Sequence, residues 1–207
     1  MRIVLAAILG GIALFMWGFV YWVVISPNFS AISSMSVDRE RAITASLNEN
    51  MPADGVYFFP GFEDHGKAVS EEDKKRLDEE WRVRHQEGPI GMIVYRRAGS
   101  EPQQPGQFLG GFLINIASAF FVACLIAISG AAGFVRRFAM VLFFGLAASF
   151  ATHGLQWNWF RFPTPYTIFQ MIDVIGGWTV AGVVIGAIAG HGTHTSRPVA
   201  APVHPTE

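Results

Sequence analysis

The segment IFQMIDVIGGWTVAGVVIGAIAG, residues 168–190, decides the class of the fold. As a helix rising about 1.5 Å per residue, it is long enough to cross the ~30 Å hydrocarbon core of a bilayer. Asp173 is its only charged side chain. A carboxylate at the centre of a membrane costs at least ~2.5 kcal/mol, so we expect Asp173 to serve either a function or the packing of the helices.

Three further apolar segments have a similar length, residues 3–25, 108–130 and 138–160. Hydrophobic residues make up 51% of the chain and charged residues 15%, against ~25% charged residues in ordinary soluble domains. The sequence therefore predicts a mainly α-helical membrane protein with four transmembrane helices and a small exported α+β domain between the first two. The third helix is the least marked, because polar residues interrupt its last part and the apolar run stops near Ala151.

The first apolar segment follows Arg2, as the core of a signal peptide would. It is longer than the ~7–15 residues of such a core, however, and it carries aromatic residues where a cleavage site needs small ones. These aromatic residues are Trp17, Tyr21 and Trp22. We therefore expect residues 1–26 to form a retained transmembrane anchor.

The arginines near the spans predict the orientation of the chain. Those on one side are Arg2, Arg136, Arg137 and Arg197, whereas the short loop on the other side has only Arg161. Because basic residues concentrate in cytoplasmic loops, we expect a multi-pass cell-membrane protein with both termini in the cytoplasm. Residues 27–107 would then be extracellular, or periplasmic in a bacterial inner membrane. The Pro- and Thr-containing tail, residues 191–207, is predicted to be disordered.

Residues 27–107 are predicted to form a helix–strand–helix–strand domain followed by a linker. Ser36 and Ser70 are suitable N-caps for the two helices, and Gly88 and a following proline provide a stop for the second. The domain has few apolar residues, so we expect it to be stabilised by packing against the membrane helices or a partner.

The loop after the third span is dense in aromatic side chains. They are Trp157, Trp159, Phe160 and Tyr166. Aromatic residues of this kind favour the headgroup region of a bilayer, which predicts an interfacial anchor. The alternative is a binding surface for the exported domain, for a partner or for an amphiphilic ligand.

Polar residues of different spans lie at similar predicted depths. Asp173 and Asn115 each lie ~10 Å inside one boundary at 1.5 Å per residue, so we expect them within hydrogen-bonding or one-water distance. Gln170 lies on the Asp173 face, and His153 and Arg161 could join the cluster. The favoured interpretation is a structural polar clamp, and the alternative is a proton- or ion-handling site.

Three glycines spaced four residues apart, Gly182, Gly186 and Gly190, lie on roughly the opposite face of the fourth helix from Asp173. Small residues at this spacing let two helix backbones approach closely. The pattern predicts a helix-packing seam, so the fourth helix is expected to be in contact on both faces.

Metal-binding residues are present only in weak patterns. Glu63, Asp64 and His65 are adjacent, and His85 could join them, but the spacing matches no specific zinc or calcium motif. A second weak candidate is His191, His194 and His204 in the tail. We expect neither a metal nor another cofactor.

Several short elements together resemble an uncharacterised family of bacterial four-span membrane proteins. They are Leu9-Gly10-Gly11 with Trp17-Gly18, residues 55–61 (GVYFFPG), Gly88-Pro89 and Trp157-Asn158-Trp159. The resemblance covers most of the chain except the tail, and it implies only the architecture, because the family has no assigned activity.

The sequence contains no nucleophile elbow, phosphate loop, dinucleotide fingerprint or zinc-protease motif, so an enzyme is the less favoured class. The favoured function is a non-catalytic membrane scaffold or accessory subunit. Its exported domain and glycine seam would contact a membrane-protein partner or a second copy of the chain, and no nucleic acid is expected. The alternative is a small transport or ion-handling protein that uses Asp173 and Asn115.

Overall fold

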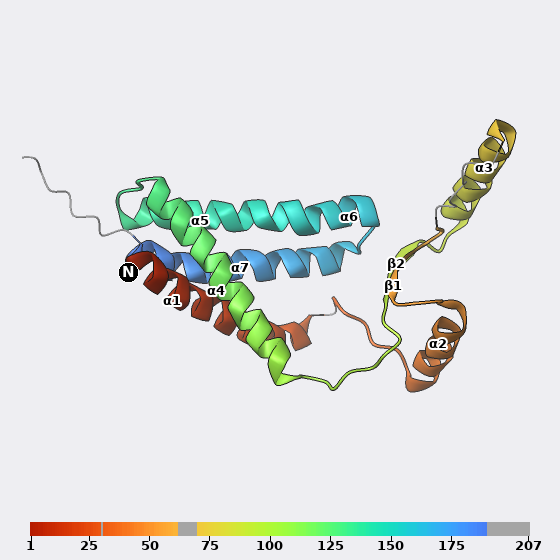
Figure 1. Cartoon of the computed structure of the whole chain (residues 1–207), viewed down its shortest axis with the longest axis horizontal. Helices are drawn as coiled ribbons and strands as arrows, with labels where there is room; N and C mark the ends of the chain where they lie inside the picture. The colour runs from red at the N-terminus through yellow and green to blue at the C-terminus, as the bar shows by residue number, and fades with distance from the viewer. Residues whose placement is uncertain (30, 62–69, 190–207) are drawn as a thin grey trace, which may run out of the picture.

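The computed structural model describes residues 1–29, 31–61 and 70–189. Four long helices form one part of the molecule, and a smaller part with two helices and a pair of strands lies beyond one end of them (Figure 1). The weak metal candidates Glu63, Asp64 and His65, the seam residue Gly190 and the tail 191–207 lie outside the described residues.

All four predicted spanning helices are present among the described residues, and each is long and apolar enough to cross a membrane. The helical elements are α1 (Arg2–Phe19) with the π-helical turn Val20–Ile25 and the 3-10 turn Ser26–Asn28, α4 (Pro105–Ile128), α5 (Phe134–Ser149) with the π-helical turn Phe150–Gly154 and α6 (Leu155–Phe160), and α7 (Thr164–Ile188). The prediction of four spans is therefore confirmed.

The third span differs from its predicted bounds. It begins at Phe134 instead of residue 138, directly after Gly133, whose φ of 81° ends the preceding loop. The sequence interpretation had placed Arg136 and Arg137 in the short link between the second and third spans. They lie in the first turns of α5, and Arg137 is buried there because backbone carbonyls accept its hydrogen bonds.

The helix α7 lies at the centre of the bundle. It packs against α1 on one side and against α5 on the other, while α4 packs chiefly on α1 and crosses the bundle obliquely (Figure 1). Small residues permit these close approaches. A β-carbon on Gly10 would lie 2.7 Å from Ile185 Cγ1 of α7, and one on Gly11 would lie 2.6 Å from Ile116 Cα of α4.

The intervening segment, between α1 and α4, has the predicted order of helix, strand, helix and strand. Its elements are α2 (Val37–Asn50), β1 (Gly55–Phe59), α3 (Glu71–Glu87) and β2 (Gly91–Tyr95). The strands pair antiparallel, from Gly55 opposite Tyr95 to Phe59 opposite Gly91. Ser70 caps α3 as predicted: its hydroxyl accepts from the Asp73 amide at 3.1 Å and donates to the Asp73 carboxylate at 2.8 Å. The bond to the carboxylate lowers the pKa of Asp73.

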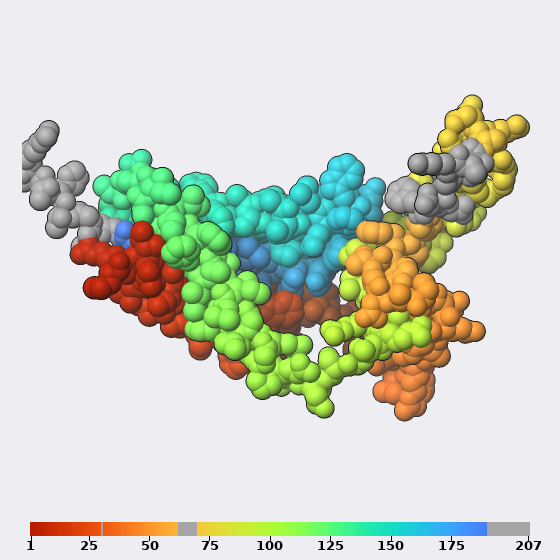
Figure 2. Space-filling view, viewed as in Figure 1, coloured from red at the N-terminus to blue at the C-terminus, as the bar shows by residue number. Residues whose placement is uncertain are grey.

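The intervening segment has little core of its own. No residue of α2 or α3 is buried, and Tyr95 is the one buried hydrophobic residue among its described residues. The Tyr95 hydroxyl donates to Asn48 Oδ1 at 2.7 Å, which ties β2 to α2. The segment and the bundle form two masses that meet near the end of α6 (Figure 2). There Phe58 stacks on Phe160 with a centroid distance of 5.8 Å.

Candidate functional site

Three aromatic residues of the first span face the N-terminal half of α7. Trp17 and Tyr21 are four residues apart, so an α-helix places them on one face. Trp22 would point away from them in a regular α-helix. The π-helical turn Val20–Ile25, with its wider i to i+5 spacing, brings residues five apart close to the same face, so Trp17 and Trp22 both reach α7.

These residues bind Asp173 of α7. The Trp17 indole N–H donates to Asp173 Oδ1 at 3.0 Å and to its backbone carbonyl at 2.9 Å, and the Trp22 indole N–H donates to Oδ2 at 2.9 Å. Both carboxylate oxygens therefore accept a hydrogen bond from α1. We call Asp173 with Trp17 and Trp22 the carboxylate clamp.

Tyr21 strengthens the same contact between helices. Its side chain is fully buried, and its hydroxyl donates to the Phe169 carbonyl at 2.7 Å. Its ring stacks on Trp17 with a centroid distance of 5.7 Å and lies 4.9 Å from the ring of Phe169. The aromatic rings thus add apolar contacts between α1 and α7 beside the clamp.

The Gly176-Gly177 pair makes room for the Trp17 indole. A β-carbon on Gly177 would lie 3.1 Å from Trp17 Cδ1, and one on Gly176 would overlap the indole ring. The pair follows Asp173 by one turn of α7, so the same turn of helix accepts the ring and binds its N–H.

Asn115 lies near Asp173 without bonding to it directly. Among the described residues, no hydrogen bond joins Asn115 to Asp173, although both line a cavity of about 280 Å³ between α1, α4 and α7. The direct side-chain donors to Asp173 are two indoles, and contact with Asn115 through one water stays a prediction. The physical reason is that α1 lies between α4 and α7, so α1 presents its donors to Asp173 at shorter range.

The remaining members of the predicted polar cluster separate into different places. His153 lies in the π-helical turn Phe150–Gly154, where its Nδ1 is 3.2 Å from Gln156 Oε1. Gln170 Oε1 is buried with no hydrogen-bond partner among the described residues. Arg161 instead follows α6 and lines a pocket next to the strands.

A second polar contact, which the sequence interpretation missed, lies at the C-terminal end of α7. Arg137 is only 6% exposed, and its guanidinium donates to the Ala131 carbonyl at 2.8 Å and to the Gly186 carbonyl at 3.1 Å. Carbonyls in the last turn of a helix have no partner within the helix, and the helix dipole favours a cation there. We call Arg137 with these two carbonyls the guanidinium clamp.

The described part of the predicted glycine seam lies against α5 of the same chain. A β-carbon on Gly182 would lie 3.3 Å from both Phe138 and Val141, and one on Gly186 would lie 3.3 Å from the Phe138 backbone nitrogen. The seam is thus occupied within the chain, whereas the sequence interpretation had assigned it to an external partner. Together with the α1 contact at Gly177, it places α7 in contact on both faces.

The side chains of the aromatic loop differ in their contacts and exposure. Trp157 donates to Thr164 Oγ1 at 3.0 Å, Tyr166 lies 5.7 Å from the ring of Phe162, and Trp159 is 72% exposed. Phe160 contacts the intervening segment through Phe58. The loop therefore supplies a contact for that segment, which was the alternative interpretation of the sequence.

Within residues 1–29, 31–61 and 70–189, no group of three or more His, Cys, Asp or Glu side chains could hold a metal ion. No protein-family model matches the chain, and neither a curated protein nor a solved structure matches it. The function is therefore argued from the site itself, and the resemblance to a four-span bacterial family stays a prediction.

Proposed function

We propose that this protein is a non-catalytic integral membrane scaffold or accessory subunit. The observation that carries the proposal is that both oxygens of Asp173 accept indole donors from α1. A proton carrier must exchange its proton with water on each side, whereas this carboxylate joins two helices. Arg137 acts in the same way at the other end of α7, where it binds backbone carbonyls.

In this proposal the intervening segment contacts the partner, which is a membrane protein or a second copy of the chain. One face of its two-stranded sheet is apolar and open: Val56 and Val94 lie opposite each other in the register and are 56% and 74% exposed. Large apolar side chains that remain exposed in this way are typical of protein interfaces. Both chain termini are proposed to be cytoplasmic and the intervening segment external, as the arginine distribution predicts.

A photo-crosslinking amino acid at Val94 tests the scaffold function in intact cells. We expect an adduct of one defined mass at Val94 and no adduct at Glu72, an exposed position on α3 that serves as the control. Absence of an adduct at Val94, with a monomeric elution volume in mild detergent, would contradict the proposal.

The orientation has its own test. In a Cys124→Ala background, Lys75→Cys should react with an impermeant thiol reagent applied to intact cells, and Arg136→Cys should not. The opposite pattern would invert the proposed topology without affecting the scaffold function.

The cavity shared by Asp173 and Asn115 favours a second candidate function, a small transport or ion-handling protein. Proton flux into proteoliposomes that contain a pH-sensitive dye distinguishes the two. Transport predicts flux that Asp173→Asn abolishes while assembly stays intact. A scaffold predicts the same background flux for wild type and variant.

A further inference from the structure

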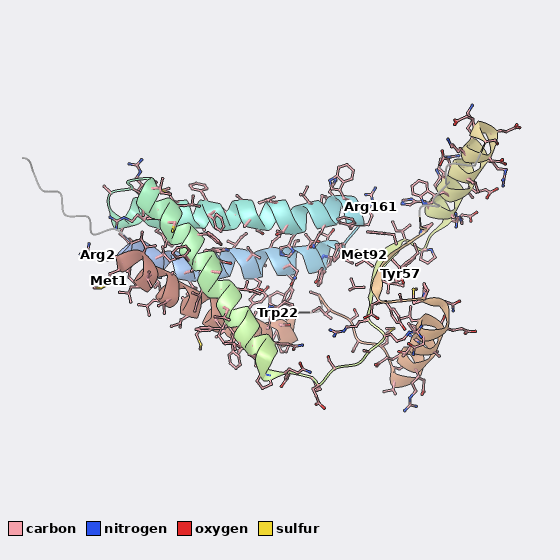
Figure 3. All side chains as sticks on the ribbon, viewed as in Figure 1. Met1, Arg2, Trp22, Tyr57, Met92 and Arg161 are labelled. Atoms are coloured by element: carbon pink, nitrogen blue, oxygen red, sulfur yellow. The ribbon has the colours of Figure 1, made fainter. Side chains whose placement is uncertain are left out.

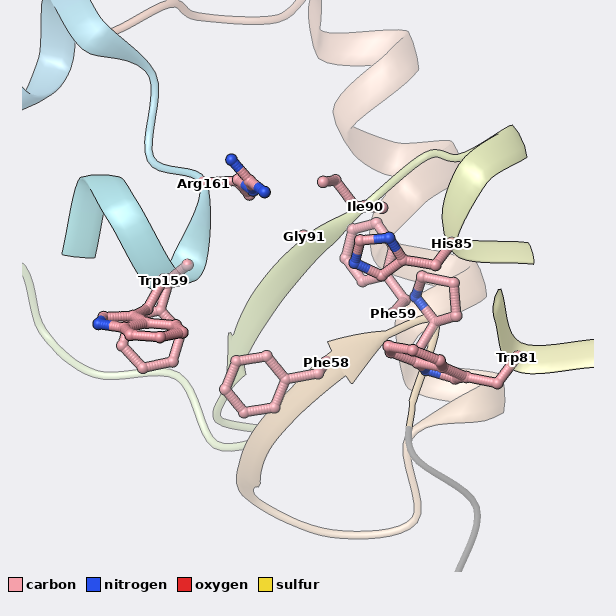
Figure 4. Close-up of a pocket in the computed structure, with 10 residues that line it drawn as sticks. Phe58, Phe59, Trp81, His85, Ile90, Gly91, Trp159 and Arg161 are labelled. Atoms are coloured by element: carbon pink, nitrogen blue, oxygen red, sulfur yellow. The ribbon is translucent and has the colours of Figure 1, made fainter. Parts of the chain in front are cut away.

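A pocket lies where the end of α6 meets the two strands of the intervening segment (Figure 4). Its volume is about 370 Å³. Aromatic side chains from three elements line most of it, namely Phe58 and Phe59 of β1, Trp81 of α3 and Phe160 of α6. The pocket is therefore formed by the bundle and the intervening segment together, and its walls are mainly apolar.

A guanidinium and an imidazole, from Arg161 and His85, complete the lining. Arg161 is the residue that ends α6, in the left-handed conformation with φ of 56°, and His85 lies on α3 with its ring 5.1 Å from that of Trp81. The guanidinium of Arg161 extends toward Ile90 and Gly91 (Figure 4). Figure 3 shows Arg161 at the end of the bundle that faces the intervening segment. Among the described residues Arg161 has no hydrogen-bond or ion-pair partner, and none of the described residues lining the pocket is acidic.

The position along the third span places this cation at the level of lipid headgroups. Phe160 is the last residue of the span that begins at Phe134, so Arg161 lies at its boundary. Trp159 beside it is 72% exposed, as an indole in the interfacial layer would be. A guanidinium at this level, with no partner among the residues that the structure describes, is well suited to bind a phosphate, because its planar N–H groups match two phosphate oxygens.

We propose that this pocket binds the headgroup of an anionic phospholipid from the surrounding bilayer. The phosphate lies against Arg161, and the aromatic walls cover the glycerol and the first carbons of the acyl chains. A volume of about 370 Å³ accommodates a headgroup, while the remainder of a lipid stays in the membrane. The bound lipid would join α6 to β1 and stabilise a segment that has little core of its own. The inference is independent of the partner proposed above.

Lipid retention by the full-length protein tests this site. The protein is released from nanodiscs of equimolar phosphatidylglycerol and phosphatidylcholine with matched chains, and bound lipids are counted by native mass spectrometry. Wild type should retain phosphatidylglycerol preferentially. Arg161→Gln should lower the ratio of the two lipids about fivefold, the factor that corresponds to ~1 kcal/mol for one basic residue near an anionic surface.

The controls separate this site from general charge effects. Arg96→Gln removes the same charge from an exposed position after β2 that does not line the pocket, and it should leave the ratio unchanged. Arg161→Lys keeps the charge and should retain most of the preference. An unchanged ratio in Arg161→Gln, or an equal fall in Arg96→Gln, would overturn the proposal. If wild type shows no preference for phosphatidylglycerol but binds inorganic phosphate, the site takes a free anion, which would equally overturn the proposal.

Discussion

The two ends of α7 are fixed by opposite charges in opposite ways. In its N-terminal half, α7 supplies the carboxylate of Asp173, and α1 supplies indole donors. Near its C-terminus, α5 supplies the guanidinium of Arg137, and α7 supplies a backbone carbonyl. The positions of Asp173 and Gly186 are ~20 Å apart along the helix at 1.5 Å per residue. The central helix is thus attached to a different neighbour at each end.

The comparison shows how each buried charge is compensated. Arg137 uses carbonyls that a helix end and a loop leave free, so its burial requires no special side chain on the other helix. Asp173 lies inside a helix whose own amides are already bonded, so its acceptors must be satisfied by side chains from elsewhere. This requirement explains the two tryptophans and the glycines that admit one of them.

The largest effect is expected from Gly176→Leu, which breaks the α1–α7 contact. The new side chain would overlap the Trp17 indole, and overpacking of this kind costs ~3 kcal/mol at the upper end of its usual range. Thermal unfolding in detergent measures the loss. Gly110→Leu in α4 is the matched control, because nothing lies within 4 Å of a β-carbon built there. Equal melting temperatures for the two variants would show that α1 does not pack as described.

Arg137→Met should have the next largest effect, because it leaves two carbonyls without their charged donor. Hydrogen bonds to charged groups contribute ~1.5–3 kcal/mol, and loss of the buried charge itself offsets part of this, so we expect a loss of ~2 kcal/mol. The neighbouring Arg136 is exposed, and Arg136→Met should change the free energy of unfolding little. Equal free energies of unfolding for Arg137→Met and wild type would show that the guanidinium clamp does not stabilise the protein.

Trp17→Phe should cost ~1 kcal/mol, since it removes the bifurcated donor to Asp173 and part of a half-buried ring. Trp159→Phe is the matched control, because Trp159 is 72% exposed and far less of its ring is packed. If both substitutions have the same small effect, Trp17 acts as an interfacial anchor and not as a clamp.

Asp173→Asn should have the smallest effect of the series. An amide keeps one acceptor for Trp17 but presents a donor to Trp22, and interhelical hydrogen bonds in membranes average only ~0.6 kcal/mol. Unfolding in mixed micelles should therefore show a loss of that size. A loss above ~2 kcal/mol would mean that the negative charge itself is needed, which this clamp does not require.

The spans and the order of elements could be predicted from the sequence because they depend on local properties. Apolar length identified four helices, and Ser70 with its following acids identified the start of α3. The spacing of Gly182 and Gly186 likewise predicted a close contact. The identity of the neighbour, α5, depends on which helices adjoin, and spacing along one helix carries no information about that.

Neither clamp could be predicted from the sequence, because each depends on which helices are neighbours in the fold. A tryptophan near the end of a span equally fits a headgroup anchor, and the π-helical turn that aligns Trp22 with Trp17 has no mark in the sequence. The equal predicted depths of Asn115 and Asp173 in the membrane indicated that the two are partners. The structure places α1 between their helices. Arg137 beside Arg136 was interpreted as a topology signal, because its burial requires the end of α7 to lie next to it.

A double-mutant cycle between the indole pair and the carboxylate tests the central claim most directly. The cycle combines Trp17→Phe and Trp22→Phe on one side with Asp173→Leu on the other, and the free energy of unfolding is measured in mixed micelles. Two side-chain bonds of ~0.6 kcal/mol each predict a coupling energy of ~1 kcal/mol. Additive effects, with a coupling below ~0.3 kcal/mol, would contradict the carboxylate clamp.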